Sequence, residues 1–346
     1  MLKERTISRE RDMSQVANFY KERFGCAHSH IAKEINKATS LIIVIPIFNE
    51  PDVISTLESL KACHLPNDPV EVILVINNSE NGKTETIKQN ELTRQEIIAW
   101  LKKNKTPKLT FNLMLENKLP AKHAGVGLAR KIGMDEALYR LGKIGKNGII
   151  ACLDADCRVD SNYLETISGL YGQGEFTSGH LYFEHPLEEE EANIREGIIN
   201  YELGLRYYVQ ALKFIQYPYA YHTIGSCMIT SAKTYALSGG MNRRKAGEDF
   251  YFLHKIFPLG GHKTFNKTCV YPSPRISDRV PFGTGRAMGK WMDMVNACKK
   301  SDKMPEYEYY ALQSFLDLGK FIAAVPCFWK YADQEIEKIM ADLPRS

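Results

Sequence analysis

Two carboxylates separated by one residue, Asp154 and Asp156, follow an apolar run that ends at Leu153. Mg²⁺ and Mn²⁺ prefer hard oxygen ligands, commonly one or two carboxylates together with phosphate oxygens and water. A metal held there would neutralise charge on a leaving diphosphate. The pair alone is equally typical of a solvated turn, but its place after a buried run favours a Mn²⁺ or Mg²⁺ site. Three histidines are candidates for a third metal ligand, although a structural or substrate-facing role is favoured for each: His180, His222 and His262.

A second acidic pair, Glu248 and Asp249, opens a stretch in which Phe250, Leu253 and Ile256 recur at helical spacing. Acidic residues are common at helix starts, because the helix dipole favours negative charge there. The chemical interpretation is a general base that removes the proton of an acceptor hydroxyl as the hydroxyl attacks. The residues alone leave both interpretations open.

Three arginines could bind an anionic substrate. Arg130 lies near a predicted helix start after a glycine-containing turn, where it could contact a nucleotide or its phosphates. Arg279 and Arg286 lie in a stretch rich in glycine and hydroxyl residues, which suits a mobile loop that closes over a diphosphate. A surface position is the alternative for each of them.

Buried strands must position these groups. Continuous apolar runs predict strands over 41–47, 70–76, 109–115 and 148–153, with helices over 93–103 and 126–141. This alternation predicts βαβ units and an α/β fold with a mostly parallel sheet. Ligands of such sheets bind beyond the carboxyl ends of the strands. The polar residues expected to converge there are Asn49, Glu50, Asn77, Asn78, Asp154 and Asp156.

The remaining regions are predicted from weaker patterns. Residues 1–40 resemble a charged, mainly helical lead-in, and 176–183 could form a strand. The acidic run 188–191 opens a tyrosine-rich helical region that extends to about residue 214, and 300–346 form a helical tail. We expect helical additions at both ends of one catalytic domain.

Composition narrows the function classes. The chain has 346 residues, 44% hydrophobic and 25% charged, with a formal net charge of +4, which argues against nucleic acid as a partner. Its eight cysteines include no C-x-x-C pair, so reduced thiols in the cytoplasm are expected. No apolar signal core or membrane-spanning run is present, and peripheral membrane contact stays open. The oligomeric state is not predicted.

Five motifs in order resemble the family 2 glycosyltransferases of the GT-A fold. Residues 45–50 resemble the opening strand of that family and 75–79 its second strand end. Residues 125–133 resemble its glycine/alanine–arginine helix, 153–156 its D-x-D element, and 239–249 its acceptor-side segment with an E-D pair. The similarity covers about residues 41–290, divided into a nucleotide-binding half (41–160) and an acceptor-binding half (161–290), with an extension over 291–346.

The resemblance implies a metal-dependent transfer of a sugar from a UDP- or GDP-sugar to a carbohydrate or small-molecule hydroxyl. Asp156 would bind the metal and Asp154 the metal or the ribose, while Asp249 would be the base of an inverting reaction beside Glu248. The residues implied for the nucleotide pocket are Pro46, Asn49, Glu50 and Arg130. Asn77 and Asn78 at the second strand end, together with Arg279 and Arg286 of the glycine-rich stretch, complete the predicted nucleotide-sugar site. Residues 223–226 would line the acceptor or donor-sugar side.

Departures from the family pattern leave alternatives. Family members often carry Asp where this chain has Asn77 and Asn78, so the nucleobase stays open. A Q-x-x-R-W motif is absent at the right spacing, which disfavours a processive polymer synthase. A retaining GT-A enzyme would not use Asp249 as base. Two further alternatives are a phosphatase of the haloacid dehalogenase type, with Asp154 as nucleophile, and a non-catalytic nucleotide-sugar binding protein.

Overall fold

The computed structural model describes residues 12–25, 30–172, 176–188, 191–277, 283–299 and 305–326. These residues form two compact units. The first contains the described residues up to Pro186 together with Thr223–Ser273, and the second contains Leu187–His222 and the described residues from Pro274 onward. The four residues predicted as catalytic groups or carboxylate metal ligands lie in the first unit: Asp154, Asp156, Glu248 and Asp249.

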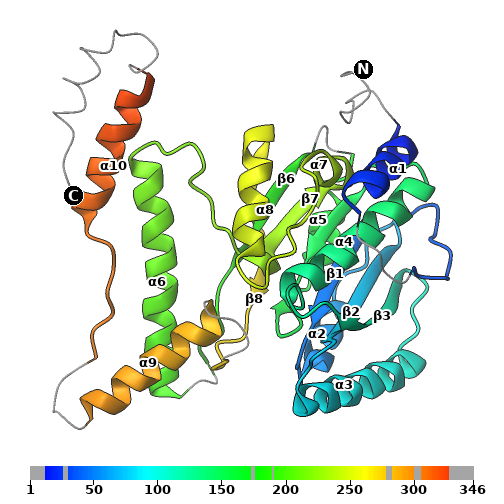
Figure 1. Cartoon of the computed structure of the whole chain (residues 1–346), viewed down its shortest axis with the longest axis horizontal. Helices are drawn as coiled ribbons and strands as arrows, with labels where there is room; N and C mark the ends of the chain where they lie inside the picture. The colour runs from blue at the N-terminus through cyan, green and yellow to red at the C-terminus, as the bar shows by residue number, and fades with distance from the viewer. Residues whose placement is uncertain are drawn as a thin grey trace. The chain divides into compact units, whose positions relative to one another are not determined.

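The first unit is built on one sheet, which has eight strands among the described residues (Figure 1). Its order is β3-β2-β1-β4-β7-β6-β8-β5; the first four strands are parallel, and β7 runs antiparallel to both its neighbours. The strands are β1 (Leu41–Ile47), β2 (Val70–Ser79), β3 (Leu109–Leu119), β4 (Ile149–Cys152), β5 (Arg158–Val159), β6 (Ser178–Phe183), β7 (Met228–Ser231) and β8 (His262–Tyr271). The predicted α/β class with a mostly parallel sheet is confirmed.

Strand β1 is buried along its whole length because β2 and β4 flank it and helices cover both faces. Its pairing with β4 ends at Val44, whose carbonyl accepts a hydrogen bond from Leu153 N–H. The backbone N–H and C=O groups of successive strand residues point alternately to the two neighbouring strands. The backbone of Pro46, two residues after Val44, therefore also points toward the β4 side, beyond the last paired residue. The missing proline N–H therefore costs no ladder bond, and β1 and β4 separate at this point.

Helices of the first unit cover the sheet in two layers (Figure 1). Right-handed crossovers place α2 and α3 on one face and α4 on the other, so the connections reverse between β1 and β4, the position where such sheets bind ligands. The helices are α1 (Met13–Arg23), α2 (Val53–Lys61), α3 (Thr84–Lys103), α4 (Val126–Lys143), α5 (Tyr163–Ser168), α7 (Ala232–Leu237) and α8 (Glu248–Ile256), with 3-10 turns η2 (Gly225–Cys227) and η3 (Phe257–Leu259).

The N-terminal helix α1 packs on α4 through buried polar contacts. Tyr20 Oη donates to Asp135 Oδ1 at 2.7 Å, Lys131 Nζ donates to Tyr20 Oη at 2.7 Å, and Tyr235 Oη donates to Asp135 Oδ1 at 2.6 Å. Buried carboxylates are tolerated when they are paired and hydrogen-bonded in this way. Helix α1 is thus part of the first unit's core, whereas residues 30–40 contain no helix, which corrects part of the prediction for 1–40.

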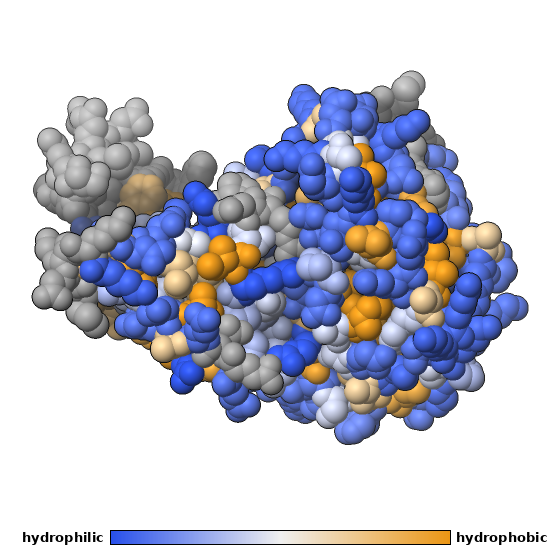
Figure 2. Space-filling model, turned by 90° about the horizontal axis from the view of Figure 1, so that it is seen from below, coloured by the Kyte–Doolittle hydropathy of each residue, from blue (hydrophilic) through white to orange (hydrophobic). Residues whose placement is uncertain are grey.

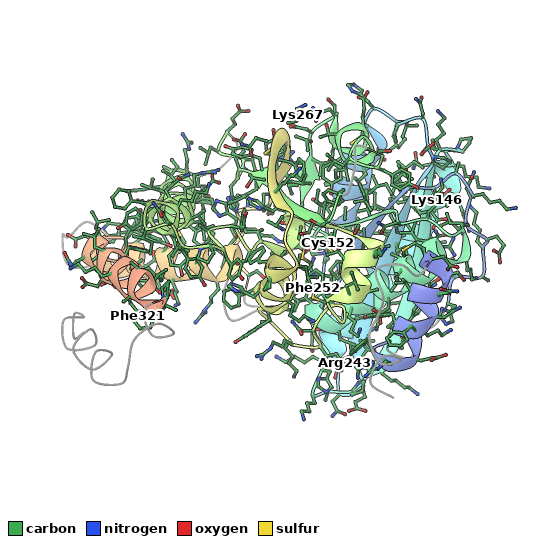
Figure 3. The ribbon with its side chains drawn as sticks, turned by 90° about the horizontal axis from the view of Figure 1, so that it is seen from above. Lys146, Cys152, Arg243, Phe252, Lys267 and Phe321 are labelled. Atoms are coloured by element: carbon green, nitrogen blue, oxygen red, sulfur yellow. The ribbon has the colours of Figure 1, made fainter. Side chains whose placement is uncertain are left out.

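Several predicted elements are longer in the structure. Helix α3 begins at Thr84 rather than near 93, and β2 and β3 extend to Ser79 and Leu119. The described cysteines are free thiols, as predicted, and burial raises the pKa of the Cys152 thiol to about 12, so it packs as a neutral group. Figure 3 shows Cys152 and Phe252 in the interior, where neither is exposed.

The second unit is helical in its described part. It contains α6 (Ala192–Phe214), α9 (Thr284–Cys298) and α10 (Leu312–Ala324). Phe315 of α10 is buried in a cluster with Ala211 and Leu212 of α6. The helical tail predicted for 300–346 is thus observed over α10, while the residues after 326 lie outside the described part of the chain.

The described surface and helices bear on membrane contact. On the face shown in Figure 2, hydrophobic residues form small groups separated by hydrophilic ones. Among the described residues, no helix combines the length and the apolar character that a membrane crossing requires.

Candidate active site

The N-terminal turn of α4 is packed tightly against the segment that precedes α8. A Cβ on Gly127 would lie 2.1 Å from the carbonyl oxygen of Arg244 and 2.9 Å from Glu248 Cβ, and one on Gly125 would lie 2.9 Å from Lys245 Cα. No side chain fits at these distances, so the two glycines allow the 244–248 backbone to approach α4. The approach brings Glu248 next to Arg130, one turn further along α4.

Arg130 binds groups from three separate parts of the first unit. Its Nη2 donates to Asp154 Oδ1 at 2.9 Å, its Nε donates to Glu248 Oε1 at 3.2 Å, and its Nη1 donates to the Gly225 carbonyl at 3.2 Å. The Arg130 side chain is 3% exposed, whereas that of Asp154 is 39% exposed. The D-x-D loop and the second acidic pair, far apart in sequence, therefore meet at one buried guanidinium.

Gly225 completes this junction. A Cβ there would lie 2.8 Å from Arg130 Nη2 and 3.2 Å from Asp249 Oδ2. The absence of a side chain lets both the guanidinium and the Asp249 carboxylate reach the same stretch of backbone. Gly225 belongs to the predicted stretch 223–226, and its contacts place Asp249 beside the Arg130 cluster. That 223–226 line the acceptor or donor-sugar side stays a prediction.

The carboxylates of α8 are harder to ionise than usual. Burial raises the pKa of Glu248 to about 7; the Arg130 charge opposes this effect, and the nearby Asp249 carboxylate reinforces it. The pKa of Asp249 is also raised, first by burial, while Arg130 and the Phe250 N–H lower it. Within the described part of the chain, the Arg130 guanidinium pairs with Asp154 and Glu248, and Asp249 lies nearby, so the cluster carries an excess of negative charge when all three carboxyl groups are ionised.

Helix α2 holds the D-x-D loop in place. Thr56 Oγ1, which is buried, donates to the carbonyl of Ala155 at 2.9 Å, between the two aspartates. Cys157 N–H closes the turn by donating to the Asp154 carbonyl at 3.2 Å. Asp154 and Asp156 are both half-buried, so part of each carboxylate faces solvent beyond the end of β4.

These two carboxylates fit a divalent cation by their chemistry. They supply hard oxygen donors, they are partly open to solvent, and the charge of the surrounding cluster favours a cation. Among the described residues, no group of three His, Cys, Asp or Glu side chains is arranged to hold a metal. Water and substrate oxygens are donors that could complete the coordination of such an ion.

The histidines considered as a third ligand do not form such a group. His180 Nδ1 lies 3.2 Å from His262 Nε2, with the two rings stacked, and His262 Nδ1 lies 2.9 Å from Ser178 Oγ. Both histidines are buried in the β6–β8 part of the sheet. His222 belongs to the second unit. A structural or substrate-facing role for these side chains stays a prediction.

The end of β1 is held by α3 and by its own side chains. Asn49 has a φ of +50°, and its N–H donates to Asn90 Oδ1 of α3 at 2.8 Å. Glu50 is buried; its Oε1 accepts from Asp52 N–H at 3.0 Å, and its carbonyl accepts from Thr93 Oγ1 at 2.6 Å. The Glu50 carboxylate thus supports the turn into α2, and its predicted contact with a nucleotide stays a prediction.

The end of β2 presents two asparagines in different situations. Asn78 is half-buried; its Oδ1 accepts from Asn90 Nδ2, and its Nδ2 donates to Asn117 Oδ1. Asn77 is fully buried, and within the described part of the chain neither polar atom of its side chain has a hydrogen-bond partner. A buried carboxamide without partners calls for a water or a ligand group, so Asn77 stays a candidate for the nucleotide pocket.

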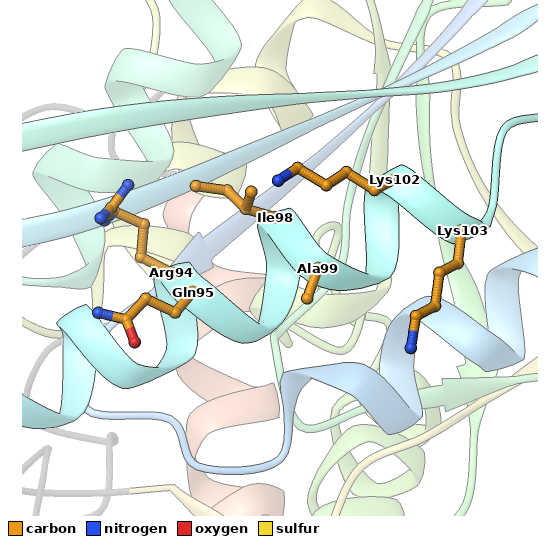
Figure 4. Close-up of a pocket in the computed structure, with 6 residues that line it drawn as sticks. All are labelled: Arg94, Gln95, Ile98, Ala99, Lys102 and Lys103. Carbon is orange, nitrogen blue, oxygen red and sulfur yellow. The ribbon is translucent and has the colours of Figure 1, made fainter.

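Two predicted arginines give no further support to the site. Arg279 lies outside the described residues, and Arg286 is exposed in the first turn of α9 in the second unit. A hollow of about 470 Å³ on α3 is lined by Arg94, Gln95, Ile98, Ala99, Lys102 and Lys103 (Figure 4). These residues lie on the face of α3 opposite Asn90 and Thr93, so the hollow is separate from the candidate site.

The chain is similar to known proteins in structure but matches none of the compared sequences. No family model matches the sequence, and no curated protein does. The chain is similar to S. aureus TarS 1-349 in complex with UDP-GlcNAc, at 12% identity and a TM-score of 0.48, over 75% of this chain and 66% of that one. It is also similar to GalNAc-T7 with UDP, GalNAc and Mn²⁺, at 15% identity and a TM-score of 0.42, over 81% and 54%. The chain therefore spans less than two thirds of each.

The structure adds one residue that the sequence did not single out. Asn90 connects the ends of β1 and β2. The sequence holds one signal for Asn90. Asn90 and Thr93 continue the stripe formed by Ile97 and Trp100, which places two polar side chains on the buried face of α3.

Proposed function

We propose that this chain is a metal-dependent glycosyltransferase of the GT-A type that transfers a sugar from a UDP- or GDP-sugar to an acceptor hydroxyl. One observation carries the proposal: Arg130 joins Asp154 of the D-x-D loop to Glu248, the neighbour of Asp249. The loop proposed to bind the diphosphate and the neighbour of the proposed base thus pair with one buried guanidinium.

The donor would lie beyond the carboxyl ends of β1, β2 and β4. There Asn49, Asn77 and Asn78 offer amide groups that can meet a nucleobase or ribose, and the backbone of β1 has parted from β4 at Pro46. Asp156 and the solvent-facing part of Asp154 would hold Mn²⁺ or Mg²⁺, which supplies neutralisation of the diphosphate charge as the bond to the sugar breaks.

Asp249 would act as the base of an inverting transfer. Its carboxylate takes the proton of the acceptor hydroxyl while the hydroxyl oxygen bonds to the anomeric carbon and the bond from that carbon to the diphosphate breaks. The raised pKa of Asp249 makes its carboxylate a stronger base than an exposed aspartate. The backbone at Gly225 and Phe250 would keep the carboxylate in one orientation.

The test is sugar transfer from UDP- and GDP-sugars to a panel of hydroxyl acceptors. We expect Asp249→Asn and Asp156→Asn to lower kcat by about 10²-fold or more, while Asp317→Asn in the second unit leaves it unchanged. Asp249→Asn should still bind the nucleoside diphosphate, whereas Asp156→Asn should lose the response to Mn²⁺. Full transfer by both variants would refute the mechanism.

Two further readouts separate the alternatives. NMR of the first product gives the anomeric configuration, and retention would remove Asp249 as the base. Phosphate release from simple phosphomonoesters without transfer would favour a haloacid-dehalogenase-type phosphatase. Nucleotide binding without turnover on any acceptor would favour a binding protein.

A further inference from the structure

Four asparagines connect the carboxyl ends of β1, β2 and β3. Asn49 N–H donates to Asn90 Oδ1 at 2.8 Å, Asn90 Nδ2 donates to Asn78 Oδ1 at 2.8 Å, and Asn78 Nδ2 donates to Asn117 Oδ1 at 2.9 Å. Asn90 Nδ2 also donates to the Asn77 carbonyl at 3.0 Å. We call this set the amide chain. It runs from the backbone of β1 to an exposed side chain on β3.

The direction of the amide chain is fixed at Asn90. Its oxygen faces a backbone N–H, which can only donate, and its nitrogen faces a backbone carbonyl, which can only accept. Turning the Asn90 carboxamide over would therefore place N–H against N–H and oxygen against oxygen. With Asn90 fixed, Asn78 must turn its oxygen toward Asn90, which leaves its nitrogen for Asn117.

The groups that the amide chain holds are those of the proposed nucleotide pocket. Asn49 is in the left-handed region, which is uncommon for a residue other than glycine and persists where surrounding contacts hold it. Asn77, whose carbonyl accepts from Asn90, carries the buried carboxamide that has no partner within the described residues. Asn90 itself is only 1% exposed, so it reaches these groups from below the surface.

We propose that Asn90 is a positioning residue for the donor nucleotide. This role of Asn90 rests on the proposed function, because Asn90 would act on the pocket in which the nucleoside diphosphate would bind. Asn90 ties the backbone of β1 to that of β2 and sets which atom of the Asn78 carboxamide points away from α3. A ligand at this edge then meets amides already held in one orientation, so less of its binding free energy is spent on ordering them.

The same geometry explains why neutral amides occupy this edge. An aspartate at 90 could still accept from Asn49 N–H, but it could not donate to the Asn77 carbonyl or to Asn78 Oδ1. Its second oxygen would face those two oxygens in a buried position, which is unfavourable. At Asn117, in contrast, the amide chain needs only an acceptor, and a carboxylate supplies one.

The experiment measures binding of UDP and of GDP by calorimetry to the full chain with Mn²⁺ present. We expect Asn90→Asp and Asn90→Ala to raise the Kd of the nucleotide by roughly tenfold or more, because buried acceptors lose their hydrogen-bond donor. Asn117→Asp keeps the acceptor end and should stay within about threefold of wild type. Asn81→Asp is the matched control, because it adds the same charge at an exposed position near the end of β2.

A kinetic readout separates positioning from folding. The Asn90 variants should raise KM for the donor while kcat at donor saturation and KM for the acceptor stay within about threefold. A lower Tm with an unchanged Kd and donor KM would overturn the positioning role and leave only a structural one. A loss in Asn117→Asp equal to that in Asn90→Asp would overturn the assigned direction.

Failure of the proposed function would look different. If wild type binds neither UDP nor GDP, the nucleotide pocket itself is refuted, and the role of Asn90 with it. If wild type binds one of them and both Asn90 variants bind it equally well while folded, only the role of Asn90 is refuted.

Discussion

Gly127→Ala tests whether the close approach of two backbones creates the active site. The new methyl group would lie 2.1 Å from the Arg244 carbonyl oxygen, whereas ordinary contact begins at 3.4 Å. The 244–248 segment must therefore retreat by about 1 Å. The 3.2 Å hydrogen bond from Arg130 to Glu248 would lengthen to about 4 Å and be lost.

Two effects follow from this displacement. Overpacking should lower the free energy of unfolding by about 1–3 kcal/mol, partly offset because alanine favours a helix over glycine. Asp249 adjoins Glu248, so it moves as well, and a misplacement of about 1 Å can reduce turnover by roughly 10²-fold. The loss in kcat should therefore exceed what the stability change alone produces at a temperature where the variant is folded.

Urea denaturation and sugar-transfer kinetics measure the two effects on the same preparation. Gly289→Ala in α9 is the matched control, because the nearest atom to its Cβ lies at 3.6 Å and the residue is also within a helix. We expect that variant to match wild type in kcat. If Gly127→Ala keeps both full stability and full kcat, the packing of α4 against 244–248 does not position the second acidic pair.

Two other perturbations test the electrostatics. Arg130→Met leaves Asp154, Glu248 and Asp249 without their cation, so the free energy of unfolding at pH 8 should fall by about 3–5 kcal/mol. The fall should be smaller at pH 5, because Glu248 takes up a proton there. Equal losses at both pH values in urea titrations would contradict this expectation. Burial lowers the pKa of His262 to about 4, so its stabilising contribution is present above pH 6.5 and is lost as the pH falls toward 4. Thermal melts across that window should show wild type losing more stability than His262→Asn, and parallel curves would refute the role of His262.

The fold was predictable from the sequence where a buried element consists of apolar residues. Residues 41–47 read as a strand because both faces of β1 are covered, and the structure places β1 over Leu41–Ile47. The first half of α3 was missed for the opposite reason. On its buried side the helix has two polar residues, Asn90 and Thr93, which donate hydrogen bonds to backbone carbonyls at the strand ends. A search for apolar periodicity therefore could not reveal this part of the helix.

The candidate site was predictable in its parts but not in its connections. Strand ends marked Asp154, and helical spacing marked Glu248, because each depends on local sequence. The partner of each is Arg130, and that pairing depends on how α4 packs against residues far away in the chain. The glycines of 125–127 suggested a flexible turn, whereas the structure uses them for contact with 244–248.

The place of Arg130 limits how a diphosphate could be bound. Its guanidinium is buried, and Asp154, Glu248 and the Gly225 carbonyl take its hydrogen bonds. Its side chain is only 3% exposed, and its single positive charge already faces the carboxylates of Asp154, Glu248 and Asp249, so it has little charge to offer a phosphate. The charge of the diphosphate therefore has to be met by a cation other than Arg130. Under the proposed function that cation is the metal at Asp156, so removal of the metal with EDTA should abolish transfer and Mn²⁺ should restore it. Transfer that persists in EDTA would assign the charge to another basic side chain of the chain.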